Sequence, residues 1–321
     1  MILTKSNSLP YNDAWKTKTG PLGFKMCNDY LFRMLLQEDP DTLKAIIASF
    51  MHVSIDEIEQ VTVINPIVPG ESVDDKEIRL DINVIMNMKK PINIEMQAYN
   101  HTGWVERSVL YACRGFDTLT HGDKYTDNMG FWQISFCDFC IFKEHPAFYR
   151  SFVLTSTDNE HIQYSDKLML SNVDLTNIEL ADEEDIRYGL VDWARLFKAE
   201  SWEELKMLAE NNQTIDKAIS SVWQMTEDER IRDRMQRRED GERLWKFIEK
   251  KAELAEKRAN EADRRANEAD KRADQADKRA NEADKRADQA DKRADQAEQT
   301  IEEQNELIRE LRDKLATYEN N

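Results

Sequence analysis

Residues 257–298 repeat a seven-residue unit, K-R-A-[ND]-[EQ]-A-[DE], six times, with one Lys-to-Arg exchange at Arg264. The alanines recur at spacings of three and four residues, which is the pattern of the a and d positions of a coiled coil. This period constrains the fold more than any other feature, because it assigns residues 241–321 to a long helix. The rest of the chain must then supply the folded core.

The charges of the repeat favour a parallel homodimer. Arg258 and its repeats occupy position g, and Asp263 and its repeats occupy position e. A parallel pair juxtaposes these residues, and each exposed pair contributes only roughly 0.2–1 kcal/mol while favouring one register. An all-alanine seam buries little area, so we expect larger residues such as Trp245 and Ile308 to stabilise its ends. The alternative is a solvated single helix with ion pairs along its own surface.

Residues 79–97 alternate apolar and polar side chains on both sides of the turn Lys89-Lys90-Pro91, which predicts an antiparallel hairpin. Counted from the turn, Asp81 falls roughly opposite Gln97 and diagonal to Glu95, so two carboxylates and an amide share one face. The carboxylates repel unless a proton or a cation lies between them, and a hard divalent cation suits oxygen ligands. The alternative is a half-solvated sheet with an acidic outer face.

The surrounding segments predict an α/β domain. Residues 1–20 are polar and read as a flexible arm, Asn28 is a candidate helix cap, and Asp39-Pro40-Asp41 breaks that helix before a second one. The order helix, three strands, helix, strand predicts a restriction-endonuclease-like core, a mixed sheet flanked by helices, within residues 21–240. A helical region and the coiled coil follow.

The helix expected at 104–120 has two different sides. One side carries Arg107, Tyr111 and Arg114. Arg107 and Tyr111 are suited to meet a phosphate or to orient Glu95, and the alternative is a solvated helix surface. The other side is apolar and comprises Val105, Val109, Ala112 and Phe116.

The hairpin resembles the core of the PD-(D/E)XK nuclease superfamily and, within it, the recombination-promoting nucleases, also called PD-(D/E)XK nuclease family transposases. Leu80 stands where the superfamily has Pro, and Gln97 stands where it has Lys, although Gln is frequent there in this group. The likeness covers roughly residues 20–240. The matching segments are L80-D-I-N-V84, I92-N-I-E-M-Q97, N28-D-Y-L-F-R-M-L-L36, R107-S-V-L-Y111, W193-A-R-L-F197 and D228-E-R-I-R-D-R-M235.

The resemblance implies a metal-dependent DNA endonuclease linked to recombination or mobile elements. Asp81 and Glu95 would bind Mg²⁺ (or Mn²⁺), and Gln97 would be the third catalytic residue. Asp29 on the opening helix and the pair Arg107 and Tyr111 are possible accessory residues.

The charge of the chain leaves two alternatives open. Of the formal net charge of −18, the neutral heptads contribute nothing and residues 299–321 contribute −3, so −15 lies in residues 1–256. Because phosphate contacts need Lys and Arg, a nuclease must gather basic residues locally. One alternative is a catalytically weakened nuclease-fold interaction protein on a coiled-coil stalk, and the other is a nuclease acting on RNA. The candidates for binding nucleic acid are Lys89, Lys90, Arg107 and Arg114.

The sequence also predicts a cytoplasmic protein without a membrane segment. No apolar run reaches the roughly 18 residues of a spanning helix, and the first residues lack the apolar core of a signal peptide. The four cysteines are too few for a disulfide framework in a chain of 321 residues, so we expect reduced thiols.

Overall fold

The structure, a computed structural model, divides the chain into two compact units: the head, Met1–Leu244, and the stalk, Trp245–Asn321. Each unit has its own architecture. The residues that the structure describes are 10–64, 82–87, 90–100, 103–117, 119, 121–210 and 212–319.

Six strands among the described residues of the head form one mixed sheet in the order β1-β2-β3-β4-β6-β5. The central strands β3, β4 and β6 run parallel, and the outer pairs are antiparallel. The hairpin predicted from the alternating residues is the pair β2–β3. The strands are β1 (Val61–Val63), β2 (Ile82–Met86), β3 (Lys90–Gln97), β4 (Phe131–Cys137), β5 (Tyr149–Thr155) and β6 (Gln163–Asp174).

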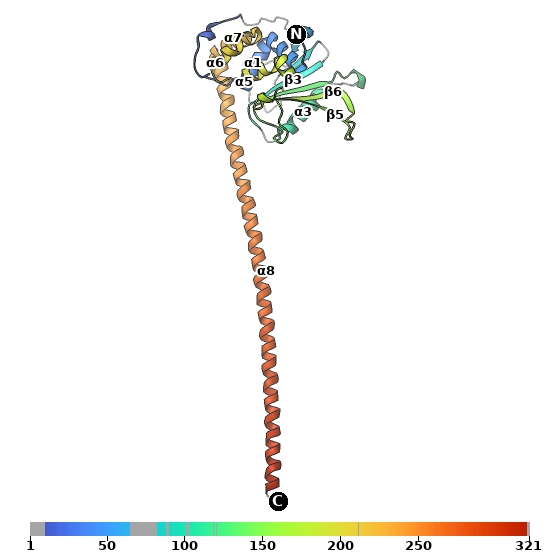
Figure 1. The fold of residues 1–321 in the computed structure, drawn as a ribbon, viewed down its shortest axis with the longest axis vertical. Helices are drawn as coiled ribbons and strands as arrows, with labels where there is room; N and C mark the ends of the chain where they lie inside the picture. Colours follow the sequence, from blue (N-terminus) through green and yellow to red (C-terminus); the bar gives the residue numbers. More distant parts are fainter. Residues whose placement is uncertain are drawn as a thin grey trace. The chain divides into compact units, whose positions relative to one another are not determined.

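Helices cover both faces of this sheet. Figure 1 shows α1, α5, α6 and α7 gathered on one side of the strands and α3 on the other. The mixed sheet flanked by helices confirms the predicted restriction-endonuclease-like α/β core. The helices are α1 (Asp29–Glu38), α2 (Pro40–Met51), α3 (Trp104–Phe116), α4 (Glu183–Arg187), α5 (Leu190–Lys198), α6 (Trp202–Ala209), α7 (Gln213–Glu227) and α8 (Glu229–Glu319).

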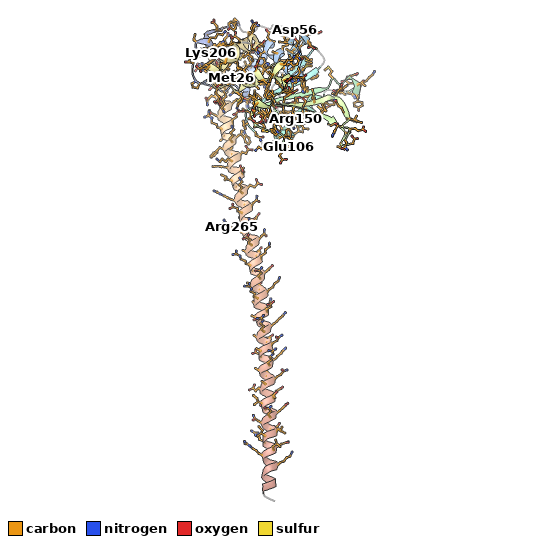
Figure 2. The ribbon with its side chains drawn as sticks, viewed as in Figure 1. Met26, Asp56, Glu106, Arg150, Lys206 and Arg265 are labelled. Atoms are coloured by element: carbon orange, nitrogen blue, oxygen red, sulfur yellow. The ribbon has the colours of Figure 1, made fainter. Side chains whose placement is uncertain are left out.

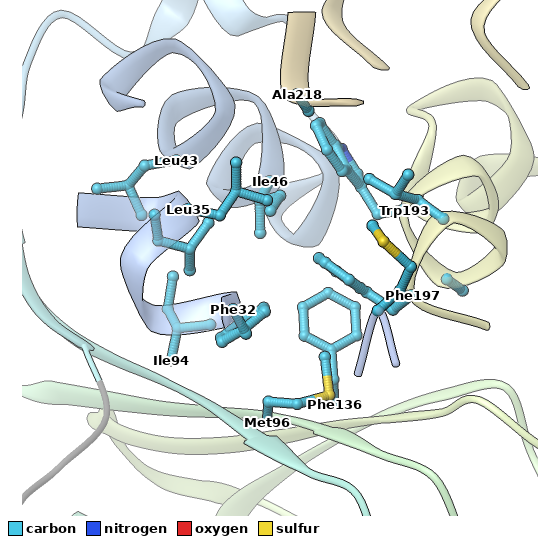
Figure 3. Packing of buried hydrophobic residues seen from close by; sticks show 14 of the residues in the cluster. Phe32, Leu35, Leu43, Ile46, Ile94, Met96, Phe136, Trp193, Phe197 and Ala218 are labelled. Carbon is cyan, nitrogen blue, oxygen red and sulfur yellow. The ribbon is translucent and has the colours of Figure 1, made fainter. Parts of the chain in front are cut away.

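The main core lies between the sheet and the helices on the α1 side (Figure 3). Phe136 of β4 is fully buried, and its ring centroid lies 5.9 Å from that of Phe32, 5.1 Å from that of Phe50 and 5.0 Å from that of Phe197. These edge-on arrangements add about 0.5–1.5 kcal/mol per pair beyond the burial of apolar area. The cluster therefore joins β4 to α1, α2 and α5.

Side-chain caps begin the first two helices, and the first of them is the predicted Asn28. The Asn28 side chain accepts hydrogen bonds from the backbone N–H groups of Tyr30 and Leu31, and Asp39 accepts one from Thr42. Each cap satisfies amides that have no partner within the helix. The Nδ2 group of Asn28 also donates to the carbonyl of Met235 at 3.2 Å, which ties the start of α1 to α8.

Helix α3 packs with a different side than the apolar pattern suggested. Tyr111 is 3% exposed, whereas Val105 and Val109 are 42% and 44% exposed. The two valines, which the sequence placed with Ala112 on the apolar side, are therefore largely exposed, and the helix ends at Phe116 rather than at 120. Burying the aromatic residues of α3 removes more apolar surface from water than burying two valines does.

A glycine lets α3 approach β4 closely. A Cβ atom added to Gly115 would lie closer than 3.0 Å to three ring atoms of Phe131, a separation at which carbon atoms overlap. Glycine normally costs about 1 kcal/mol in a helix interior relative to alanine. Its presence here therefore reflects the contact with the aromatic ring.

Helix α8 contains 91 residues, which at about 1.5 Å per residue corresponds to roughly 137 Å. All described side chains from 250 to 312 are exposed, including Arg265, which projects from the helix in Figure 2. Apolar residues of the heptad pattern such as Ile301 and Ile308 are 57% and 46% exposed. Within the described ranges, no helix is long and apolar enough to cross a membrane.

Candidate functional site

Polar side chains line the face of the sheet that α3 covers. Along β3, Asn93, Glu95 and Gln97 alternate with residues of the main core, and they are only 0%, 1% and 9% exposed. The parallel register sets Asn93 beside Gln133 and Glu95 beside Ser135 on β4. Buried polar groups are stable only when they are hydrogen-bonded, so specific contacts must hold this row.

Asn93 makes two of these contacts. Its Nδ2 group donates one hydrogen bond to Oε1 of Glu95 at 3.0 Å and another to Oε1 of Gln133 at 2.9 Å. The two bonds join neighbouring residues on β3 and β4 around a buried carboxylate. Such a carboxylate is costly unless donors or cations compensate its charge.

Asp81, the predicted partner of Glu95, lies outside the described residues. Its chain neighbour Ile82 begins β2 and pairs with Ile94, the residue before Glu95. In the parts of the chain that the structure describes, no group of three or more His, Cys, Asp or Glu could hold a metal ion. The predicted pair of carboxylates thus stays a prediction.

Gln97 ends β3 at the edge of this polar row, beside Cys137 of β4. Burial raises the pKa of the Cys137 thiol well above its ordinary value, and the charges of Asp174 and Glu95 raise it further. The negative charge of Glu95 thus acts on Cys137, the strand neighbour of Gln97. An amide at this place adds no charge to an already acidic surrounding.

Arg107 and Tyr111 are joined on α3. The Nε of Arg107 donates to the Tyr111 hydroxyl at 2.6 Å, and its guanidinium carbon lies 5.1 Å from the Tyr111 ring centroid and 5.7 Å from that of Trp104. Because Tyr111 is buried, the interpretation of this residue as solvated surface is wrong. The two aromatic rings hold the guanidinium group over the start of the helix.

Asp29 lies among charges gathered near the end of β3. Its Oδ2 is 3.6 Å from Nε of Arg238, and its Oδ1 accepts the backbone N–H of Tyr30 at 2.7 Å. Burial, followed by the charges of Glu242 and Asp29, raises the pKa of Tyr99 to about 12, while Arg107 and Arg238 lower it. Residues far apart in sequence therefore share one charged neighbourhood two residues beyond Gln97.

The basic candidates are less concentrated. Arg114 is exposed on α3, and no ion pair of Arg114 occurs among the described side chains. Lys89 and the side chain of Lys90 fall outside the described part of the chain. Of the predicted nucleic-acid contacts, the structure thus places only Arg107 and Arg114, both on α3.

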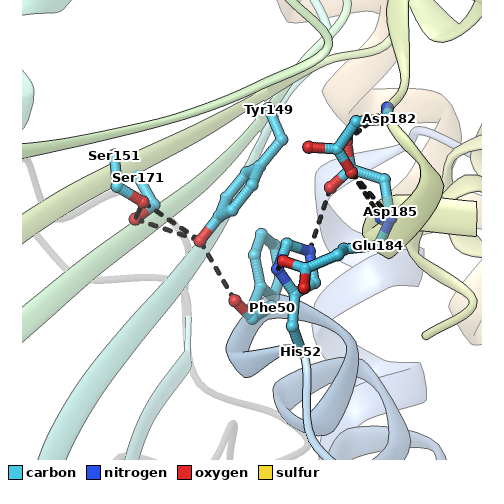
Figure 4. Close-up of polar contacts among 8 residues, drawn as sticks. All are labelled: Phe50, His52, Tyr149, Ser151, Ser171, Asp182, Glu184 and Asp185. Carbon is cyan, nitrogen blue, oxygen red and sulfur yellow. Dashed lines mark hydrogen bonds and ion pairs between the residues drawn. The ribbon is translucent and has the colours of Figure 1, made fainter. Parts of the chain in front are cut away.

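A second polar cluster lies on the opposite side of the sheet (Figure 4). His52 ends α2 and contacts Asp185 of α4 through Nε2 at 3.0 Å and Glu184 through Nδ1 at 3.5 Å. Its ring stacks on Tyr188 with a centroid distance of 5.7 Å. Since carboxylates face both ring nitrogens, the cluster ties α2 to α4.

Sequence reasoning missed Asn93, Gln133 and Arg238. The first two carried a readable signal: Asn93 alternates onto the same face as Glu95, and Gln133 is an isolated amide in the apolar strand 131–137. Arg238 carried none, because its contact with Asp29 spans more than two hundred residues of chain.

Comparisons with known proteins agree with the two-unit organisation. The family model for PD-(D/E)XK nuclease family transposases matches residues 26–247. The model for the alanine-zipper of the major outer membrane lipoprotein matches residues 248–314. No curated protein and no solved structure matches the chain.

Proposed function

Because the chain belongs to the PD-(D/E)XK nuclease family transposases, we propose that its head is a metal-dependent endonuclease that cleaves DNA. The observation that carries the proposal is the buried carboxylate of Glu95 on β3, held by an amide within the matched region. A link to recombination or mobile elements, and action in the cytoplasm, belong to the same proposal.

The donor set fits a hard divalent cation such as Mg²⁺ or Mn²⁺. Asp81 and Glu95 supply carboxylate oxygens, and Gln97 supplies an amide oxygen, which are the ligand types that such ions prefer. The described hairpin register pairs Ile82 with Ile94, which differs by two residues from the alignment counted from the turn. When bound, the cation would activate a water molecule and neutralise charge that develops on the phosphate.

The other candidate residues would orient the substrate and the ligands. Arg107 is held by two aromatic rings, so its guanidinium group can approach a phosphate with little loss of side-chain freedom. Asp29 stands near Tyr99 and Arg238, where it can complete the acidic side of the site. Lys89, Lys90 and Arg114 would contact the flanking phosphates.

The stalk would bring two heads together as a parallel homodimer. Its match to an alanine-zipper and the exposed apolar residues of its heptad pattern support this pairing. Light scattering is expected to show a dimer for the full chain and a monomer after truncation behind Leu244. The truncated head should nick plasmid more often than it linearises it; a monomeric full chain at micromolar concentration would overturn the pairing.

A plasmid-cleavage assay with Mg²⁺ or Mn²⁺ tests the proposed activity. Asp81→Ala and Glu95→Ala should abolish cleavage while the melting temperature stays within a few degrees. Glu160→Ala, which removes an exposed carboxylate between β5 and β6, serves as the matched control and should cleave like the unmodified protein. Full activity in either site variant refutes the site, and an RNA substrate in a parallel arm shows which nucleic acid is cut.

A second candidate function is favoured by the formal charge of −15 on residues 1–256, which is the total of −18 less the −3 of residues 299–321. Together with Gln97 in place of Lys, this charge suits a nuclease-fold interaction protein that has lost much of its activity. This alternative predicts metal binding without cleavage of either nucleic acid. The same assay, combined with a Mn²⁺ titration, separates the two functions.

A further inference from the structure

In the polar row beneath α3, the side-chain amide of Asn93 donates two hydrogen bonds. Nδ2 of Asn93 donates to the Glu95 carboxylate at 3.0 Å and to the Gln133 carbonyl oxygen at 2.9 Å. An ionised carboxylate accepts hydrogen bonds and cannot donate them. The Glu95 carboxylate must therefore face the NH₂ group of the Asn93 amide and not its oxygen. The amide orientation follows from the network.

The strand geometry makes this network local and rigid. Asn93 and Glu95 are two residues apart on β3 and therefore share one face, and Gln133 is the direct register neighbour of Asn93 on β4. The three side chains are at most 1% exposed. Gln133 orients Asn93, and Asn93 in turn holds Oε1 of Glu95.

A sheet does not require a polar network on its buried face. The opposite face of β3 is filled with Ile92, Ile94 and Met96, and apolar side chains of equal size could fill this face as well. Buried polar networks are often no more stable than such apolar replacements. Their retention around a carboxylate therefore points to a task for that carboxylate.

We propose that Asn93 is a positioning residue for Glu95, and that Gln133 orients it. The inference rests on the proposed function, since it gives Glu95 the task of binding a divalent cation. The Asn93 amide occupies one carboxylate oxygen and restricts rotation of the group, so the cation meets Glu95 in one orientation. Donors that orient a metal ligand in this way typically change metal affinity or activity by about 10–100-fold when removed.

The test uses substitutions that keep side-chain size and remove the donor. Asn93→Leu is nearly isosteric, but it leaves the buried Glu95 and Gln133 side chains without their shared donor, so its melting temperature should fall. Its affinity for Mn²⁺, measured by electron paramagnetic resonance with the metal alone, should fall about 10–100-fold. In plasmid cleavage, kcat should fall while KM for DNA stays the same, because the DNA contacts remain.

Asn128→Leu is the matched control. Asn128 is also a buried asparagine with two hydrogen bonds, from its Nδ2 to the Phe116 carbonyl and from the Gly130 N–H to its Oδ1. This variant should lose thermal stability and keep the Mn²⁺ affinity of the unmodified protein. A structural role of Asn93 alone would give the two variants the same behaviour.

Gln133→Met keeps the inference testable if Asn93→Leu does not fold. It removes the acceptor that orients Asn93, so Mn²⁺ affinity should fall by a smaller factor in the same direction. Unchanged Mn²⁺ affinity and kcat in the folded variants, beside an active unmodified protein, would overturn the positioning role and leave the proposed function intact. An unmodified protein that neither binds Mn²⁺ nor cleaves would overturn the proposed function and this inference with it.

Discussion

Gly115→Ala sets two effects of opposite sign against each other. In an unobstructed helix the change stabilises, because alanine is favoured over glycine by about 0.8–1.0 kcal/mol. In α3 the new methyl group would overlap the ring of Phe131, which is 4% exposed and packed beneath the helix. The neighbour that must yield is thus a buried aromatic ring.

The overlap is the larger effect. Forcing an extra carbon into a packed interior costs about 1–3 kcal/mol, which exceeds the gain in helix propensity over most of that range. We therefore expect Gly115→Ala to lower the free energy of unfolding of the head by about 1 kcal/mol. Because α3 also carries Arg107 and Tyr111, displacement of the helix should reduce DNA cleavage as well.

Urea unfolding of the head measures the difference against a control in the same protein. Gly241 is exposed in α8, and an added Cβ would meet nothing within 4 Å. Gly241→Ala should stabilise by up to about 1 kcal/mol. In a Phe131→Leu background, Gly115→Ala should become neutral or stabilising. Equal stabilisation by Gly115→Ala and Gly241→Ala in the unmodified protein would refute the close contact between α3 and β4.

Three further predictions follow from described contacts. His52→Ala should lower the free energy of unfolding by about 1–3 kcal/mol, because it removes the His52 ring from Oδ1 of the buried Asp185 carboxylate, whose Oδ2 accepts the backbone N–H of Asp182; urea denaturation measures this, and an unchanged midpoint contradicts it. At pH 8 a disulfide reagent should label exposed Cys113 first, since burial raises the pKa of Cys27 to about 11 and keeps its reactive thiolate scarce; equal labelling rates in the folded protein refute this. Gln97→Lys should retain or raise plasmid cleavage, because a cation can offset charge developing in the transition state, whereas Gln97→Ala should be slower; a dead lysine variant beside an unaffected alanine variant removes Gln97 from the chemistry.

The sequence was sufficient to predict the hairpin, its two faces and the first helix cap. The alternation of Ile94 and Glu95 separates core from site on β3 because successive strand residues point to opposite faces. Asn28 caps α1 because its side chain can reach the free amides of the first turn. These features depend on neighbouring residues alone.

Features that depend on tertiary contacts could not be predicted in this way. Both sides of α3 carry apolar surface, so its pattern did not reveal that Tyr111 is buried and Val109 is exposed. The choice depends on a sheet face that only the assembled strands create. The approach of Arg238 to Asp29 depends in turn on how α8 returns to the start of α1.

The heptads of the stalk also bear on how this protein can change over generations. Each unit adds seven residues, no net charge and about 10 Å of helix, and it returns the alanine seam to the same side. Near-identical tandem units in a coding sequence can misalign during replication, and whole units are then gained or lost. Such events would lengthen or shorten the helix in steps of seven residues. The alanines would stay aligned on one side of the helix, and the added residues would have the same surface as the others.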